Sequence, residues 1–342
     1  MKKSILLLCA IVLTCCCQSC HKKEKVKTPD LTKEQMKSVR DVNVTMVRYE
    51  RDLFSLDTSH IADGVKKLYG KYPENLISNN CWNNAQMMRG LKGYISDPII
   101  REIYKATKEK FPDMKATEKV LDDAFKIYLS NFPNSKVPTI YTILPGLDFS
   151  TPSVFGYEDN LFVCVDMYLG ENFKYYTAAG MPKFIARRCT PDRIPLDCFT
   201  KGMAYKHLPD KTLITLLDNM IYEGKKLYFT QIMFPDTKEI DIIGYTEEQY
   251  KWAQEHISQI WQYFIEKKLL YSKDEDDIRR MIDETPFTRE FGNNSPGRIG
   301  SYIGLQIIKS YMHNHSDVTL EELMKNEDAQ GILNKAGFKP KF

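Results

Sequence analysis

The chain has 342 residues, of which 48 are basic and 45 acidic, and its formal net charge is +3. This balance gives no basic stripe and argues against nucleic acid as a partner. Hydrophobic residues make up 43% of the sequence, enough for a sizeable core. Because no repeat or low-complexity linker divides the later part of the chain, we expect one globular domain over residues 41–342.

The N-terminus has the layout of a bacterial lipoprotein signal peptide over residues 1–20. Two lysines follow the first methionine, and the apolar run 5–13 is too short to cross a bilayer. A small residue precedes Cys20, as in a lipobox, so we expect lipidation at Cys20. Cys16 and Cys17 are the alternatives. This places the mature protein in a bacterial envelope, anchored by lipid.

Residues 21–40 are charged and contain few apolar positions, which is typical of a solvated tether. Basic residues follow Cys20 directly, whereas some bacteria export lipoproteins to the cell surface by means of acidic residues at these positions. We therefore expect an outer-membrane anchor with the domain facing the periplasm, and exposure at the cell surface is the alternative.

The rest of the chain indicates a helix-rich α+β domain in which helices cover a small sheet. Alternating or continuous apolar patterns predict strands at 42–49, 137–144 and 160–169. Helical periodicity predicts helices at 62–70, 83–94, 97–110, 116–131, 173–187, 194–207, 211–230, 247–268, 275–284, 296–313 and 318–335, the last with a break near Asn326.

Four cysteines remain in the predicted domain: Cys81, Cys164, Cys189 and Cys198. An oxidising envelope would permit disulfides, and Cys189 and Cys198 are closest in sequence, but spacing does not fix the connectivity. Cys164 lies in an apolar run, so we expect it to be a buried thiol.

The predicted helix 211–230 carries Glu223 beside Gly224 at the edge of its apolar face, and Pro209 and Asp210 resemble a helix start. A glycine inside a helix costs about 1 kcal/mol relative to alanine. Gly224 therefore suggests that another element passes close to the backbone there.

A second glycine-rich helix is predicted from Ser295, as N-cap, and Pro296. Gly297, Gly300 and Gly304 would give it a glycine-lined side for close packing. Anion binding at the helix start, assisted by Arg298, is the alternative.

No catalytic constellation is evident. The chain lacks HExxH and GxSxG motifs, and no two of its six histidines stand four residues apart. We assign no catalytic residue, metal or cofactor from the residues themselves. The aromatic stripe in 247–271 is more typical of a core than of a ligand platform.

Longer motifs resemble the gliding-motility lipoprotein family GldB of the Bacteroidetes. They are RYERDLFSLD, TLITLLDNMIYEGKKLYF, IGYTEEQYKWAQEHISQIWQYFIEKKLLYS and SPGRIGSYIGLQIIKSYM. The likeness spans the mature chain. It implies an envelope lipoprotein that works with motility or secretion proteins.

The same family is distantly similar to zinc peptidases of the zincin type, which implies a zincin-like architecture. In those enzymes a helix with HExxH precedes a helix carrying a glutamate ligand and glycine, which Glu223 and Gly224 resemble. The matching first helix, 194–208, retains only His207 and would present Asp197, Lys201 or Tyr205 at ligand positions. One histidine and one glutamate are a poor zinc site.

We therefore expect a non-catalytic, pseudo-peptidase scaffold for interactions in motility, secretion or envelope assembly. Two alternatives stay open: a peptidase rearranged around Glu223, His207 and Asp197, and a peptide- or glycan-binding lipoprotein with Trp252, Tyr263 and Tyr302 along a groove. The candidate cleft consists of Glu223, Gly224, His207, Arg298 and Tyr302.

Overall fold

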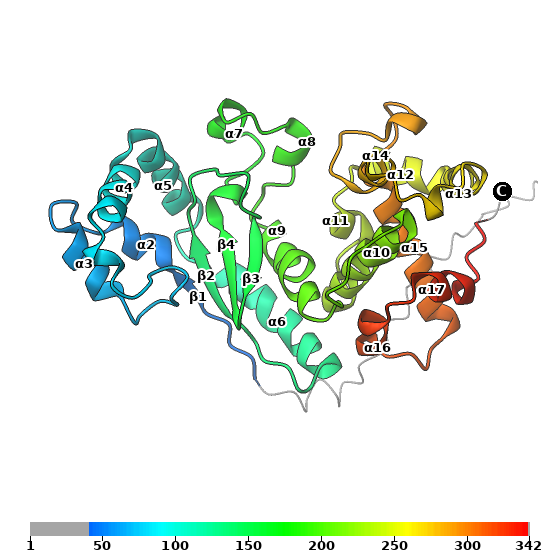
Figure 1. Cartoon of the computed structure of the whole chain (residues 1–342), viewed down its shortest axis with the longest axis horizontal. Helices are drawn as coiled ribbons and strands as arrows, with labels where there is room; N and C mark the ends of the chain where they lie inside the picture. Colours follow the sequence, from blue (N-terminus) through cyan, green and yellow to red (C-terminus); the bar gives the residue numbers. More distant parts are fainter. Residues whose placement is uncertain (1–40, 341–342) are drawn as a thin grey trace, which may run out of the picture.

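A computed structural model describes residues 41–340 (Figure 1). The predicted signal peptide, the lipidation site Cys20 and the tether lie outside the described residues. Within them, the structure is a helix-rich α+β fold around a small sheet, which confirms the predicted class.

The sheet has four strands in the order β1-β2-β4-β3. The strands are β1 (Met46–Arg48), β2 (Thr139–Ile143), β3 (Val154–Tyr157) and β4 (Asn160–Cys164). β1, β2 and β4 are parallel, and β3 runs antiparallel at the edge. In register, Ile140 of β2 pairs with Met46 of β1 and Leu161 of β4. β4 is buried along almost its whole length, as its continuous apolar run requires.

The strand predictions need three corrections. The strand predicted over 160–169 ends at Cys164, because the chain turns into the 3-10 helix η2 (Val165–Tyr168) directly after β4. β1 is shorter than 42–49. Before it, the Val44 N–H donates to Asp122 of α6 (Lys115–Asn131) at 2.6 Å, and after it α2 begins at Tyr49. Glu118 of α6 accepts the N–H of Met46, the first residue of β1, at 2.8 Å. The edge strand β3 was not predicted. It is only four residues long and contains Gly156, so its pattern is weak.

Helices flank the sheet on both sides (Figure 1). Most of the N-terminal helices lie on one side, and the C-terminal helices lie on the other. The N-terminal set is α2 (Tyr49–Phe54), α3 (Ile61–Leu68), η1 (Cys81–Asn83), α4 (Ala85–Ser96) and α5 (Pro98–Lys110). Asn84 and Asp97 accept two backbone N–H bonds each and so define the starts of α4 and α5.

A connecting region leads from β4 to the C-terminal helices. It comprises η2 (Val165–Tyr168), α7 (Lys174–Ala178), α8 (Lys183–Ala186), α9 (Arg193–Asp197), the π-helical turn η3 (Cys198–Met203) and η4 (Ala204–Lys206). The single helix predicted over 173–187 is two short helices, because Gly180 has a positive φ of 84° and Pro182 follows. The predicted 194–207 helix exists, with a π-helical centre.

The C-terminal half is helical, as predicted. Its elements are α10 (Leu216–Met233), α11 (Glu239–Ile243), α12 (Glu247–Glu255), α13 (Ile257–Glu266), η5 (Leu269–Tyr271), α14 (Glu275–Ile282), η6 (Arg289–Phe291), α15 (Ile299–Asn314), α16 (Leu320–Lys325) and α17 (Ala329–Ala336). The break near Asn326 is confirmed between α16 and α17. The predicted helix 247–268 is divided at His256, which ends α12.

Both helices that prompted the site hypothesis begin later than predicted. α10 starts after Thr215, which forms a capping box with Asp218, rather than at Pro209. α15 starts after Arg298, not at Ser295. The Ser295 hydroxyl instead accepts the Thr288 N–H and donates to the Gly292 carbonyl, so it fixes a turn before the helix.

α10 and α15 cross in backbone contact. A Cβ atom added to Gly304 would lie 1.8 Å from the Met220 carbonyl oxygen, and one added to Gly224 would lie 2.4 Å from the Gly304 carbonyl carbon. Both separations are far shorter than a van der Waals contact. The two glycines therefore allow the approach that the sequence suggested, and the crossing lies within a core that extends from Val44 to Ala336.

We expect Gly304→Ala to lower the free energy of unfolding by at least about 3 kcal/mol, since backbone atoms of α10 must move away from the new methyl group. Gly90→Ala is the matched control. Gly90 also lies inside a helix, but a Cβ there meets nothing within 4 Å, so stability should rise by about 1 kcal/mol. Urea unfolding followed by circular dichroism measures both. Equal changes in the free energy of unfolding for the two variants would contradict the close backbone contact between α10 and α15.

Candidate functional site

A cleft of about 940 Å³ opens between the sheet edge and the C-terminal helices. One wall comes from β3 and the segment 188–206, and the other from α10, the end of α14 and the residue before α15. Six basic and five acidic side chains line it: Arg188, Arg193, Lys201, Lys206, Lys226 and Arg298, with Glu158, Asp197, Glu223, Asp283 and Glu284.

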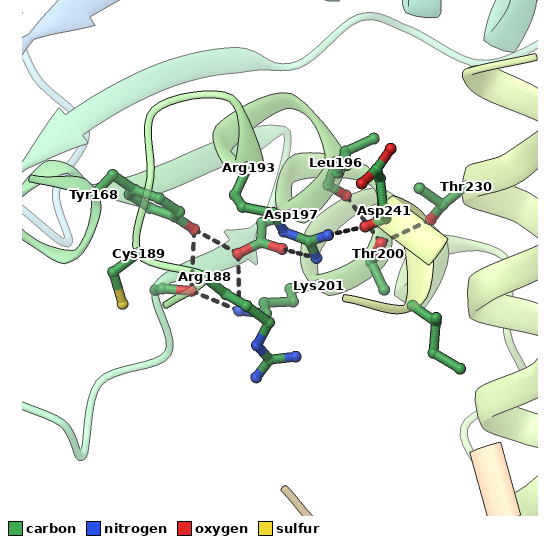
Figure 2. A network of polar contacts seen from close by, with 12 residues as sticks. Tyr168, Arg188, Cys189, Arg193, Leu196, Asp197, Thr200, Lys201, Thr230 and Asp241 are labelled. Atoms are coloured by element: carbon green, nitrogen blue, oxygen red, sulfur yellow. Dashed lines mark hydrogen bonds and ion pairs between the residues drawn. The ribbon is translucent and has the colours of Figure 1, made fainter. Parts of the chain in front are cut away.

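Asp197 is the centre of a buried polar network on the sheet side (Figure 2). Its carboxylate accepts hydrogen bonds from Tyr168 Oη at 2.7 Å, Lys201 Nζ at 2.9 Å and Arg193 Nη2 at 3.1 Å. Arg193 and Lys201 lie four residues before and after Asp197, so the helical segment places both cations on one face. Tyr168 reaches Asp197 from η2.

The network also joins the cleft walls. Lys201 Nζ donates to Ser153 Oγ at 2.8 Å, just before β3, and Arg193 donates to the Asp241 carbonyl of α11. Thr200 donates to the Leu196 carbonyl at 2.9 Å, and its hydroxyl lies 2.8 Å from that of Thr230 in α10. The short helices of segment 193–206 are thereby fixed to both sides of the cleft.

The charge on Asp197 is strongly favoured in the fold. Burial by itself opposes ionisation, but Lys201 and Arg193, together with the hydrogen bonds from Lys201 and Tyr168, outweigh it and hold the Asp197 pKa well below its usual value. Because the pKa is lower in the folded state, the resulting stability is present above pH 3.8 and is lost as the pH falls below that value.

A second group of ion pairs lies on the α10 side. The Glu223 carboxylate accepts a hydrogen bond from Lys226 Nζ at 2.8 Å and lies 3.8 Å from Arg298 Nη2. Glu284 lies 2.7 Å from Arg188 Nη2 and 3.2 Å from Arg298 Nη1. Burial opposes the charge of Lys226, yet Glu223 outweighs it and raises the Lys226 pKa.

The predicted cleft residues thus divide into two sets. Glu223 and Arg298 line the cleft and form an ion pair, whereas Gly224 faces α15. Tyr302 is buried near the rings of Tyr245 and Tyr250, with centroid distances of 6.2 and 6.4 Å, and does not line the cleft.

His207 is also absent from the cleft wall. Its Nε2 lies 2.9 Å from Tyr128 Oη, and its ring stacks on Phe132 with a centroid distance of 3.9 Å. Burial lowers the His207 pKa to about 4. The rearranged peptidase site, one of the alternatives that the sequence left open, therefore lacks its histidine, because the side chain points into an aromatic cluster that also includes Phe229.

The aromatic groove proposed from the sequence does not form around this cleft either. Trp252 stacks on His256 with a centroid distance of 4.2 Å, and Tyr263 packs edge-on against Phe291 at 5.1 Å. Neither side chain lines the cleft. Among residues 41–340, all cysteines are buried free thiols, so the prediction for Cys164 is confirmed and Cys189 and Cys198 are not paired.

The donors do not fit the zinc ion that a zincin likeness implies. In the described part of the chain, no three histidine, cysteine, aspartate or glutamate side chains could hold a metal together. Lys201 occupies one implied ligand position, and its ammonium group has no lone pair to donate. Asp197 and Glu223 are already neutralised by neighbouring cations.

Sequence reasoning missed Arg188, Lys226 and Glu284. Lys226 follows Glu223 by three residues on a helix, so the ion pair could have been predicted from that spacing. Arg188 and Glu284 are 96 residues apart and meet only through the tertiary fold. No local signal pointed to that pair.

The geometry defines a helix-rich α+β protein with an ion-paired cleft. No helix within residues 41–340 is both long and apolar enough to span a membrane. The family profile described as "Gliding motility protein GldB" matches residues 30–340, and the chain belongs to this family. Comparisons with curated proteins and with solved structures gave no match. Membership implies a gliding-motility lipoprotein, anchored by lipid in the cell envelope.

We expect Asp197→Asn to lower the free energy of unfolding by on the order of 3 kcal/mol, because the change leaves Arg193 and Lys201 without their counter-charge. Asp192→Asn, at an exposed position on the same segment, should change stability by less than about 0.5 kcal/mol. Urea titrations at pH 7 compare the two. Similar small effects would show that the network contributes little.

The His207 environment predicts a pH effect with a definite sign. The folded pKa is lower than that of an exposed histidine, 6.5, so protonation favours the unfolded chain. Stability should therefore fall between pH 6.5 and pH 4, and His207→Gln should reduce this loss. The matched control is His313→Gln, at an exposed site. An NMR titration midpoint of His207 near 6.5 would contradict the assignment.

Proposed function

We propose that this lipoprotein uses a zincin-like scaffold as a non-catalytic binding module in gliding motility or a related envelope process. Support comes from the arrangement of its elements. An antiparallel edge strand, β3, lines the cleft, the helical segment 193–206 follows it in the chain, and α10 then supplies Glu223 and Gly224. This order agrees with the peptidase likeness that the sequence suggested.

One observation carries the non-catalytic part of the proposal. The side chains at the implied ligand positions, Asp197, Lys201 and Glu223, are all engaged in ion pairs with neighbouring residues. Lys201 and Lys226 place positive charge beside the two carboxylates that a zinc ion would need, and like charges repel strongly in a partly buried site. A cleft built in this way is suited to holding a ligand rather than a divalent cation.

The anchor and the cleft together fit a module that engages other envelope proteins. A lipid on Cys20 would hold the domain at the outer membrane, with the tether 21–40 setting its distance from the surface. The cleft would then meet its ligand on the periplasmic side. We propose motility or secretion proteins as the source of that ligand.

The proposal is tested by the metal content and turnover of the full-length protein, purified in detergent from cells grown with added zinc and then washed. Elemental analysis should find substoichiometric transition metal, and a quenched-fluorescence casein assay should show no cleavage above that of Glu223→Gln. One zinc per chain that is lost in Glu223→Ala but kept in Glu255→Ala, an exposed control, would overturn it.

A further inference from the structure

The two ion-pair groups that line the cleft carry an excess of positive charge. Around the two ion-pair groups, three carboxylates (Asp197, Glu223 and Glu284) face five cations (Arg188, Arg193, Lys201, Lys226 and Arg298). Lys206, Glu158 and Asp283 complete the charged lining. Burial, assisted by the nearby Glu223 and Glu284, raises the pKa of Asp283, although Arg279 opposes this shift. A negatively charged group of a ligand would neutralise the remaining positive charge.

Arg298 has no short ion pair in the cleft. Its side chain is 13% exposed, and both of its carboxylate neighbours lie at 3.2 Å or more. Among the described residues, its guanidinium hydrogen bond is a long one, 3.4 Å, to the Ile243 carbonyl. A guanidinium carries five N–H donors. Arg298 therefore retains donors that a ligand in the cleft can use.

The backbone holds Arg298 in place in a conformation that non-glycine residues seldom adopt. Its φ is 55°, and Tyr245 Oη donates to the carbonyls of Gly297 and Arg298, at 2.8 and 3.2 Å. A Cβ on Gly297 would lie 2.1 Å from the Thr285 carbonyl oxygen, so this turn is packed tightly. Backbone strain of this kind clusters at binding sites, where it fixes a side chain in advance.

Arg188 completes a two-arginine site. Its Nη2 lies 2.7 Å from Glu284, the carboxylate that also faces Arg298. Glu284 is 41% exposed at its side chain, so it is the most accessible carboxylate of the two ion-pair groups. A ligand carboxylate could take its place between the two guanidinium groups, because planar arginine donors match a carboxylate well.

The rest of the cleft indicates the size and character of the ligand. Apolar side chains line both walls of the cleft among the charges: Val154, Phe155, Leu227, Ile242 and Ile282. A volume of about 940 Å³ exceeds the need of a single small anion and suits a drug-sized or short peptide ligand. Mixed apolar and cationic walls favour a peptide that carries both apolar and carboxylate groups.

We propose that the cleft binds a peptide segment through a carboxylate group held by Arg298 and Arg188, in competition with Glu284. This inference rests on the proposed binding function and names its ligand class. The carboxylate can belong to an acidic side chain or to a peptide C-terminus, since both present the same two oxygens to the arginines.

Fluorescence polarisation with the full-length protein in detergent tests this inference. The probes are fluorescein-labelled octapeptides of alternating leucine and a polar residue. The first has glutamate and an amidated C-terminus, the second has glutamine and a free C-terminus, and the third has glutamine and an amidated C-terminus. We expect the first or the second to bind at least about tenfold more tightly than the third, and the tighter of the two identifies the source of the carboxylate.

Two variants with opposite effects separate recognition from misfolding. Arg298→Gln should weaken binding of the carboxylate probe at least about tenfold, whereas Glu284→Gln should strengthen it, because it removes the competing carboxylate. Arg279→Gln, at an exposed arginine outside the cleft, is the control and should leave affinity unchanged. An unfolded protein cannot show the gain expected for Glu284→Gln.

Three results would overturn the inference. The first is equal binding of all three probes that neither Arg298→Gln nor Glu284→Gln changes. This result would mean that the cleft binds peptides without recognising a carboxylate. The second is binding of none of them. The third is sedimentation with phosphatidylglycerol vesicles that depends on Arg298, without peptide binding, which would assign the arginines to a lipid headgroup. None of these results requires bound zinc or turnover, so they are distinct from failure of the proposed non-catalytic function.

Discussion

The close crossing of α10 and α15 is the constraint on which the arrangement of the cleft depends. Backbone atoms of the two helices meet at Gly224 and Gly304, where any side chain would separate them. That contact fixes Glu223, one residue before Gly224, relative to Arg298, at the residue before α15. Gly224 therefore sets the distance between α10 and α15, and Glu223 beside it neutralises Arg298, the cation that precedes α15.

The opposite wall depends on a different interaction, the buried carboxylate of Asp197. Arg193 and Lys201 neutralise Asp197 within one helical segment, while Lys201 and Thr200 connect that segment to Ser153 before β3 and to Thr230 of α10. The cleft thus lies between two sets of ion pairs, each held by its own helix contacts. A metal-binding peptidase cleft needs free carboxylate and imidazole lone pairs. Here the carboxylates are satisfied by lysine and arginine, and the remaining positive charge of the two ion-pair groups favours an anion.

Much of the fold could be predicted from the sequence, because most helices and strands show the apolar periodicity typical of their type. The helix carrying Glu223, the glycine contact and the break near Asn326 follow from local patterns. The starts of α10 and α15 do not, since Thr215 and Asp218 compete with Pro209 as a helix start, and Ser295 is used in a turn instead of a cap. At the site, Glu223 and Arg298 share the cleft, whereas His207 turns into an aromatic cluster. The pairing of Arg188 with Glu284 depends on tertiary structure that no local pattern encodes.

We propose that lysine and arginine side chains, rather than a metal ion, neutralise Asp197 and Glu223 in the cleft. An anomalous-difference map from crystals grown with zinc, with data on both sides of the zinc absorption edge, tests it most directly. We expect no zinc peak among Asp197, Lys201 and Glu223, and side-chain density for the ion pairs Lys201–Asp197 and Lys226–Glu223. A zinc peak coordinated by Glu223, with Lys226 turned away, would contradict it.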